Sequence, residues 1–180
     1  MTTVSESGHF VQFFEDDTAL VCGVCDFLRA GFESDATCIA LTTAEHRARI
    51  ADELKARGVD AAMLEAKYCY IPLDANFALS TFMGESGPDR HRFHKSMELL
   101  MRQAGARGQP VRVVGEMVGM LAERGDFGSV LALEELWNEL SRLHPFTLLC
   151  GYLRSVFQGP AAQDVMKRIC AVHSRVLSAA

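Results

Sequence analysis

The feature that most constrains the fold is a set of five short, nearly unbroken apolar runs, each separated from the next by a longer segment. The runs cover residues 9–14, 37–41, 68–73, 111–116 and 146–152. Strands covered on both faces have such runs, whereas half-exposed strands alternate apolar and polar residues. Strands that alternate with helices form parallel sheets. We therefore expect an α/β fold, in which a mostly parallel sheet of five or more strands lies between helices in a three-layer sandwich.

The segments after the first two runs carry the signals of helix starts and stops. Asp16 or Asp17 can cap a first helix whose apolar face repeats at helical spacing until Gly31 ends it. Thr42 and Glu45 have the spacing of a capping box, which predicts the start of a second helix.

The second half of the chain predicts further helices and one irregular stretch. Residues 83–90 form the least structured stretch, which we expect to act as a lid near the strand ends. Ser129 is expected to cap a long helix, and Pro160 lies in the first turn of the last one. The apolar face of that last helix is expected to run through His173 to Val176.

Composition excludes several classes of protein. The chain has 180 residues and no linker or repeat, so we expect one domain over residues 1–180. A net charge of -5 argues against nucleic acid as a partner, since that partner needs a basic face. No apolar run approaches the roughly 20 residues of a membrane helix. The N-terminus is polar and acidic, unlike a signal peptide, so a cytoplasmic location is expected.

The loop after the first apolar run is unsuited to phosphate. It reads Glu15-Asp16-Asp17 and has neither glycine nor lysine, both of which a phosphate-binding loop requires. None of the four lysines in the chain follows a glycine, so a Walker A motif is excluded. We expect a non-enzymatic protein without a bound cofactor.

Ligands of open α/β sheets bind beyond the carboxyl ends of the strands. The polar residues expected there are Glu15, Asp16, Asp17, Thr42, Thr43, Asp74, Glu116, Tyr152 and Arg154. This rim is mostly acidic, which disfavours a free triphosphate unless a metal ion intervenes. Glu116 ends an apolar strand, as the acid of a nucleotide-hydrolysing site does. It equally fits an acid at the start of the next helix, favoured by the helix dipole.

Each candidate cysteine and histidine has a structural interpretation as well as a functional one. Cys22 and Cys25 form a C-x-x-C pair, but inside a helix rather than at its start, so we expect core thiols; redox sensing is the alternative. Zinc would need a second ligand pair in the sequence, and we expect no metal site. His91 and His94 are interpreted as part of a solvated helix face. His173 is expected in the core.

Six motifs follow one another along the chain. They are residues 9–14, 27–32 and 38–43, an Arg-x-x-Gly-Glu-Met element at 112–117, a Glu-x-x-x-Asn element taken over 135–140 with Cys-Gly-Tyr at 150–152, and Cys-x-x-His at 170–173. In order and spacing they resemble the MEDS family, the methanogen/methylotroph, DcmR-type sensory domain. One departure is Leu153, which stands where the resemblance leads us to expect an acid.

The resemblance implies a fold similar to the RecA/KaiC ATPase core without its P-loop, and a sensory role that precedes a histidine kinase or a DNA-binding regulator. It carries over six motif positions, His9, Arg112, Glu116, Cys150, Tyr152 and His173, without assigning their ligands. Because the sequence ends after this domain, its output is expected to pass to a separate signalling protein.

We therefore expect a sensory domain that binds an unidentified small molecule, a signalling partner, or both. The candidate ligand-binding residues are His9, Glu15, Asp17, Thr42, Arg112, Glu116, Cys150, Tyr152 and His173. A protein-interaction module that self-associates without any ligand is the alternative. A residual nucleotide-binding enzyme that uses Glu116 is a third hypothesis.

Overall fold

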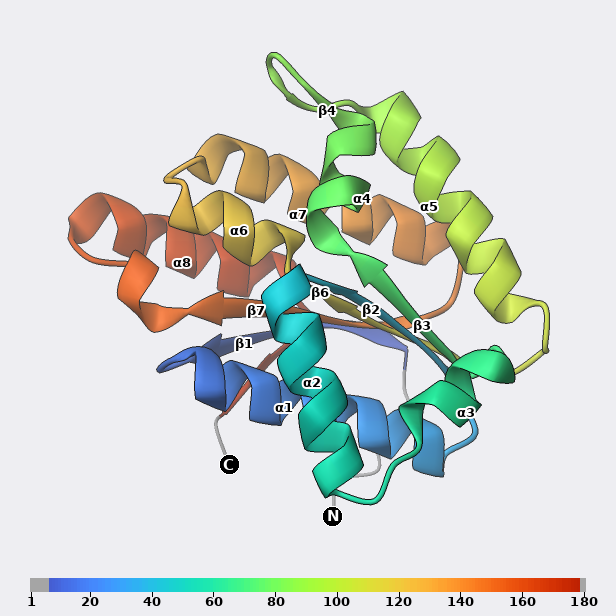
Figure 1. Cartoon of the computed structure of the whole chain (residues 1–180). Coiled ribbons are helices and arrows are strands. Elements are labelled where there is room, and N and C mark those ends of the chain that lie inside the picture. The colour runs from blue at the N-terminus through green and yellow to red at the C-terminus, as the bar shows by residue number, and fades with distance from the viewer. Residues whose placement is uncertain (1–6, 179–180) are drawn as a thin grey trace.

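A computed structural model describes residues 7–178 of the chain. Residues 1–6, on which the expectation of no signal peptide rests, lie outside the described residues. A six-stranded parallel sheet in the order β3-β2-β6-β7-β1-β8 forms the centre of the fold (Figure 1). Its strands are β1 (Gly8–Phe14), β2 (Thr37–Thr42), β3 (Tyr70–Asp74), β6 (Val111–Gly115), β7 (Thr147–Leu153) and β8 (Arg175–Leu177). The predicted fold class is therefore confirmed.

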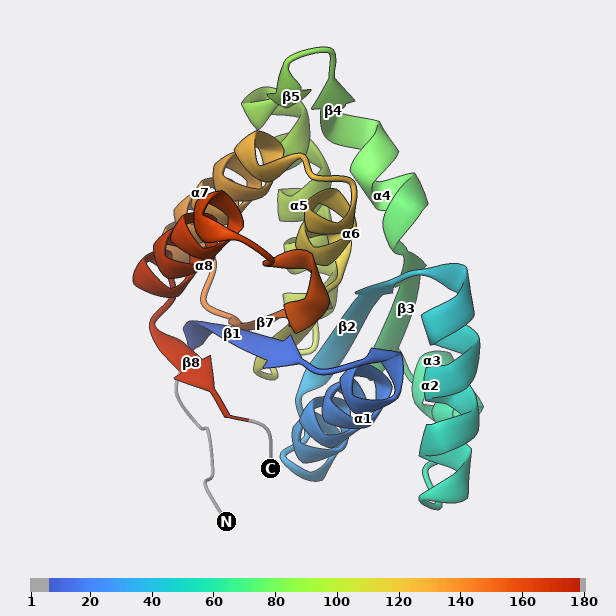
Figure 2. The same cartoon turned by 90° about the vertical axis from the view of Figure 1, so that its left-hand side faces the viewer.

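Helices cover both faces of the sheet, which makes three layers (Figures 1 and 2). One face carries α1 (Asp17–Glu33), α2 (Ala44–Ala56) and α3 (Ala61–Ala66). The opposite face carries α4 (Ala75–Phe82), α5 (Arg90–Gly105), α6 (Met117–Glu123), α7 (Phe127–Leu143) and α8 (Pro160–Val172), with a 3₁₀ turn, η1 (Arg154–Val156), after β7. Among the described residues, no helix is both long and apolar enough to cross a membrane.

The apolar runs are unbroken because side chains of each of these strands pack into two cores, one on each face of the sheet. In β1, Val11 and Phe13 pack under α6, α7 and α8, while Phe10 and Phe14 pack on the α1 side. Successive strand residues point to opposite faces, so a strand between two helical layers has few polar positions. His9 is one of them, and it faces the larger core.

Several helix ends differ from the predictions. α1 continues past Gly31 to Glu33, and the Asp16 carboxylate caps it by accepting a hydrogen bond from the Ala19 amide at 2.8 Å. Thr43, one residue after the predicted Thr42, caps α2 by accepting from the His46 amide.

The long helix α7 also begins earlier than predicted. The Asp126 carboxylate caps it by accepting from the amide of Ser129, so Ser129 lies inside the first turn rather than at the cap. α8 ends at Val172, one residue before His173, and Val176 lies in a strand.

The sequence analysis also missed some elements. The six-residue helix α3 and the helix α4 were not predicted, and neither was the edge strand β8. Residues 83–90 contain a small hairpin of β4 (Met83–Gly84) and β5 (Gly87–Pro88), rather than an unstructured stretch.

Candidate functional site

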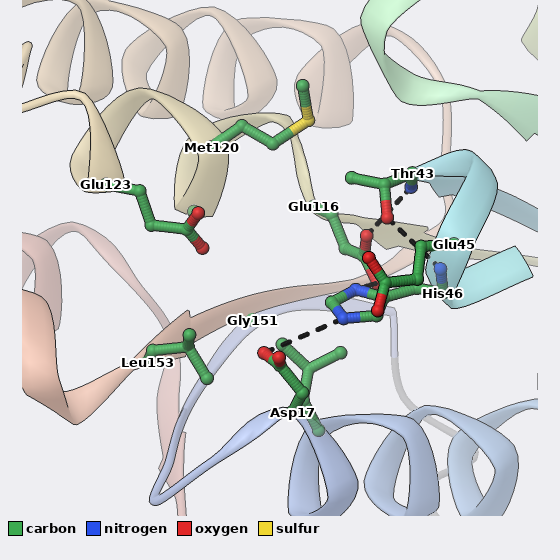
Figure 3. Close-up of a pocket in the computed structure, with 11 residues that line it drawn as sticks. Asp17, Thr43, Glu45, His46, Glu116, Met120, Glu123, Gly151 and Leu153 are labelled. Atoms are coloured by element: carbon green, nitrogen blue, oxygen red, sulfur yellow. Dashed lines mark hydrogen bonds and ion pairs between the residues drawn. The ribbon is translucent and has the colours of Figure 1, made fainter. Parts of the chain in front are cut away.

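A pocket of about 280 Å³ opens at the carboxyl ends of the central strands (Figure 3). This is where open α/β sheets hold ligands. Its lining comes from α1, the β2–α2 turn, α6 and the end of β7: Asp17, Leu20, Thr43, Glu45, His46, Glu116, Gly119, Met120, Glu123, Gly151 and Leu153. No residue of the β4–β5 hairpin lines it, so the hairpin does not close this pocket as the predicted lid would.

Glu116 lines the pocket and lies between the ends of β2 and β6. It occupies the cap position of α6 but makes no side-chain cap bond there. Its carboxylate instead accepts a hydrogen bond from the Thr43 amide at 2.9 Å and lies 3.0 Å from His46 Nδ1. Because the side chain is only 5% exposed, this acid fixes the β2–α2 turn against the end of β6.

His46 bridges two acids from different helices. Its Nδ1 faces Glu116, and its Nε2 lies 3.7 Å from Asp17 Oδ1 at the start of α1 (Figure 3). The hydrogen bond with Glu116, supported by the charges of Glu116 and Asp17, raises the pKa of His46 above its usual value although burial acts in the opposite direction. The protonated imidazole donates a hydrogen bond to Glu116 and forms a longer ion pair with Asp17.

The pocket carries an excess of negative charge. Asp17, Glu45, Glu116 and Glu123 contribute four carboxylates, against the single imidazole of His46. Burial, with a smaller contribution from the charge of Asp17, raises the pKa of Glu123. The four carboxylates make additional negative charge unfavourable there, so the pocket suits a cation or a hydrogen-bond donor.

The loop before α1 is occupied by the chain's own acids. In nucleotide-binding folds a helix N-terminus here would hold phosphate. The Asp16 carboxylate accepts from one of the free amides of α1, that of Ala19, and Glu15 pairs with Arg154 at 2.7 Å. A phosphate would have to displace one carboxylate and approach another.

Two predicted site residues lie away from this pocket. Thr42 is fully buried, and its hydroxyl has no hydrogen-bond partner among the described residues. Arg112 points to the α1 face, where its guanidinium lies 4.0 Å from the centroid of the Phe27 ring. Burial lowers the pKa of Arg112. Of the nine candidates, Asp17 and Glu116 line the pocket, and Glu15 lies beside it.

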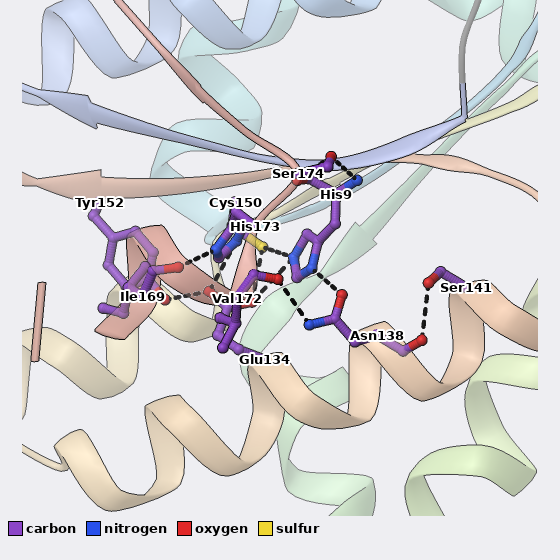
Figure 4. A network of polar contacts seen from close by, with 10 residues as sticks. All are labelled: His9, Glu134, Asn138, Ser141, Cys150, Tyr152, Ile169, Val172, His173 and Ser174. Carbon is purple, nitrogen blue, oxygen red and sulfur yellow. Dashed lines mark hydrogen bonds and ion pairs between the residues drawn. The ribbon is translucent and has the colours of Figure 1, made fainter. Parts of the chain in front are cut away.

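The other four candidates meet in the larger core, away from the pocket. His9, Cys150, Tyr152 and His173 surround Glu134 of α7, which is fully buried (Figure 4). One carboxylate oxygen of Glu134 lies 3.1 Å from His9 Nε2 and 3.4 Å from Cys150 Sγ. The other oxygen accepts a hydrogen bond from the Tyr152 hydroxyl and lies 3.5 Å from His173 Nε2.

The surroundings shift the pKa values of this group strongly. Burial acts to raise the pKa of Glu134, but hydrogen bonds with His9 and Tyr152 and the charge of His173 lower it overall. Burial raises the pKa of the Cys150 thiol well above its usual value, and Glu134 adds to this effect. Burial lowers the pKa of His173.

The sequence analysis missed Glu134 and His46, and one of the two carried a usable signal. The Glu-x-x-x-Asn spacing, counted back from Asn138, falls on Glu134 rather than on Glu135 where the element was taken to begin. Glu134 also interrupts the apolar face of α7 between Val130 and Trp137. His46 sits in an otherwise polar helix start, and no pattern distinguished it.

The C-x-x-C pair lies inside α1, on the other face of the sheet. Cys25 is fully buried, and this burial raises the pKa of its thiol to about 12. Such a thiol forms little of the reactive thiolate at neutral pH. The six cysteines are all free.

Comparison with known proteins gives one match that spans nearly the whole domain. No curated protein matches the chain closely enough to count as a relative. A family model does match, over residues 8–173, and its description reads MEthanogen/methylotroph, DcmR Sensory domain. The match begins beside His9 and ends at His173, so it encloses both the pocket and the buried group around Glu134. The chain therefore belongs to the MEDS family of sensory domains.

Proposed function

We propose that this sensory domain binds a small, positively charged molecule, such as a protonated organic amine, in the pocket at the strand ends. The observation that carries the proposal is the placement of four carboxylates around one pocket of about 280 Å³. That volume lies near the lower end of the range for small-molecule sites. The apolar side chains of Leu20, Met120 and Leu153 would contact the organic part of such a ligand.

The pocket offers a direct way to couple binding to a change of shape. A cation that pairs with Glu116 competes with the Thr43 amide and with His46 for the same carboxylate. Binding therefore favours a state in which the β2–α2 turn is released from β6. A ligand shifts such an equilibrium by the difference of its affinities for the two states.

The output of the change would pass to another protein. We propose a cytoplasmic signalling partner of the histidine-kinase or transcription-regulator class. Its binding would depend on the position of α2. The six free cysteines, three of which are buried, fit a reducing compartment. We also propose that the fold is similar to the RecA/KaiC ATPase core.

Calorimetric titration of the chain with simple amines, matched carboxylic acids, and ATP with Mg²⁺ tests the ligand class. We expect amines to bind and the other two to fail. Glu123→Gln should weaken amine binding by about tenfold, since a lost charge contact costs roughly 1.4 kcal/mol. Glu123 suits the test because among the described residues its carboxylate makes no hydrogen bond or ion pair on which the fold depends.

Glu65→Gln, an exposed acid on α3, is the matched control and should leave the affinity unchanged. Binding of ATP would instead support a residual nucleotide site. Equal amine binding by the Glu123→Gln and Glu65→Gln proteins would contradict the assignment of the ligand to this pocket.

The alternative of an interaction module without a ligand has a weaker basis. The most exposed aromatic side chains are Tyr68 and Phe77, at 75% and 73% exposed. They flank opposite ends of β3, which places them roughly 20 Å apart at the rise of a strand. They therefore do not form one continuous apolar patch.

A further inference from the structure

We propose that His9, Glu134, Cys150 and His173, here called the His-Glu-Cys-His cluster, bind one divalent transition-metal ion, with zinc the best match to the donors. The cluster lies between the sheet and helices α7 and α8, away from the pocket at the strand ends (Figure 4). Imidazole and thiolate are preferred ligands of zinc, and a carboxylate oxygen completes a common donor set.

Three of the four donor atoms, those of His9, Glu134 and Cys150, have a spacing close to that of a tetrahedral site. Zinc bonds of about 2.0–2.3 Å place neighbouring donors roughly 3.3–3.7 Å apart. In the cluster, His9 Nε2 lies 3.1 Å from the Glu134 carboxylate and 3.2 Å from Cys150 Sγ. Cys150 Sγ lies 3.4 Å from that carboxylate. One donor atom from each of the four residues falls within 4.8 Å of all the others.

The proton positions on His9 are fixed by its neighbours. The side-chain amide of Asn138 donates through Nδ2 to the Val172 carbonyl at 2.9 Å, so its Oδ1 must be the atom that faces His9 Nδ1, also at 2.9 Å. That oxygen only accepts hydrogen bonds, so Nδ1 of His9 carries a proton. A metal ion in the cluster would take the place of the proton that Nε2 shares with the Glu134 carboxylate, and Nε2 would then present its lone pair to the ion.

His173 is oriented in the same way by the backbone. Its Nδ1 lies 2.6 Å from the Ile169 carbonyl, which can only accept, so Nδ1 carries the proton. Its Nε2 is buried without a hydrogen-bond partner among the described residues. Metal-binding histidines in proteins usually donate their second ring nitrogen to a carbonyl or a side-chain oxygen. Both histidines of the cluster do so.

Charge balance also favours a dication. The bound ion would face the Glu134 carboxylate and the Cys150 thiolate, and one dication with two anions has no net charge. A neutral, fully coordinated group is far cheaper to bury than an isolated carboxylate. On binding, Cys150 would release its thiol proton to solvent, and the proton shared by His9 Nε2 and Glu134 would also be released. The Tyr152 hydroxyl would keep its hydrogen bond to the second oxygen of Glu134.

Four protein donors leave no open position for a substrate, which is the mark of a structural metal site. The donors come from β1, α7, β7 and the residue after α8. An ion there would tie the first strand of the domain to its last helix. A hollow at α7 and the end of α8 is lined by Asn138 and Val172, which are hydrogen-bonded to each other next to His9, whereas none of the four donors lines it.

Titration of chelator-treated protein with Co²⁺ tests the proposal, because a cobalt–thiolate bond gives an intense near-ultraviolet band and tetrahedral cobalt gives visible bands. We expect one Co²⁺ per chain, displaced by Zn²⁺. Cys150→Ala should lose the thiolate band. Cys38→Ala, which removes an equally buried thiol on the other face of the sheet, should keep it. Asn138→Ala, which frees His9, should keep the band but weaken binding about 10–100-fold.

The absence of a thiolate band from the wild-type protein would overturn the proposal, and so would a band that persists in Cys150→Ala. If Cys150→Ala does not fold by circular dichroism, Glu134→Gln replaces it, since it preserves the shape of the side chain. Unchanged cobalt affinity in a folded Glu134→Gln protein would then overturn the assignment.

Discussion

The imidazole of His46 joins two acids that the chain supplies from far apart. Asp17 opens α1 and Glu116 follows β6, and both carboxylates face the same ring. The three side chains contact one another directly, because the ends of the strands bring their segments together. Its strength depends on whether the ring is protonated.

The pH dependence of stability follows from that ring. The folded-state pKa of His46 is raised, chiefly by the hydrogen bond with Glu116, so the folded state favours the protonated ring. The resulting stabilisation is complete below the unfolded pKa of about 6.5 and is lost as the pH rises through the folded pKa. We expect the free energy of unfolding of the wild-type protein to fall over that window, and His46→Gln to remove this part of the fall. Urea denaturation at a series of pH values measures it.

His91→Gln is the matched control, because His91 is exposed near the start of α5. It should leave the pH profile of the wild-type protein unchanged. If the His46→Gln and wild-type proteins show parallel profiles, the His46–Glu116 contact does not contribute to stability.

The site could be predicted from the sequence only in part. The rule that ligands lie beyond strand ends led to Asp17 and Glu116, and both line the pocket. The same rule placed Tyr152 at the rim, but β7 extends one residue further and turns that side chain into the core. Glu134 could have been found from its Glu-x-x-x-Asn spacing to Asn138, whereas His46 acts through contacts between distant segments that single-sequence patterns do not report.

At the element scale, helix α6 is held unusually close to the sheet. A Cβ atom added at Gly119 would lie 2.7 Å from the Gly151 carbonyl oxygen of β7. Both glycines line the pocket, so the approach of α6 to β7 sets part of its floor. The neighbours are backbone atoms, which cannot move aside as a flexible side chain can.

Gly119→Ala should therefore destabilise the protein by about 1–3 kcal/mol, the usual cost of overpacking a core. Gly128→Ala in α7 is the contrast, because its added Cβ meets no atom closer than 3.9 Å. Alanine in a helix is favoured over glycine, so that change should stabilise by up to about 1 kcal/mol. Thermal unfolding of the two variants compares them. A neutral Gly119→Ala would show that α6 can move away from β7.

The five strands that the sequence predicted share one property, which is that both of their faces are covered. The five predicted strands have unbroken apolar runs because helices cover both of their faces. Two of the three missed elements, α3 and β8, are little buried. Helix α3 has no buried residue, and β8 is a three-residue edge strand with two exposed positions. Asp74 was taken to close a strand, whereas its carboxylate also caps α4.

At the scale of the whole molecule, the sheet divides the protein into two cores that share every central strand. Strands β2, β6, β7 and β1 have neighbours on both sides, whereas β3 and β8 are the edges. Cooperative units of a fold open in order of their burial and their hydrogen bonding.

Native-state hydrogen exchange should follow this order. We expect the slowest amide exchange in β6 and β7 and the fastest strand exchange in β8, which pairs with β1 alone through three residues. Mass spectrometry of peptides after timed exchange reads out each strand. Protection of β8 equal to that of β7 would show that the last strand belongs to the same cooperative unit as the centre of the sheet.

The strand order has a consequence for how the chain is made. β1 is the first strand to be synthesised, yet its two partners, β7 and β8, are the last. At roughly 5–20 residues per second, the ribosome delivers β7 on the order of ten seconds after β1. For much of that interval the apolar segment from Gly8 to Phe14 has no partner strand. It stays an unpaired apolar strand until the segments of β7 and β8 have been made.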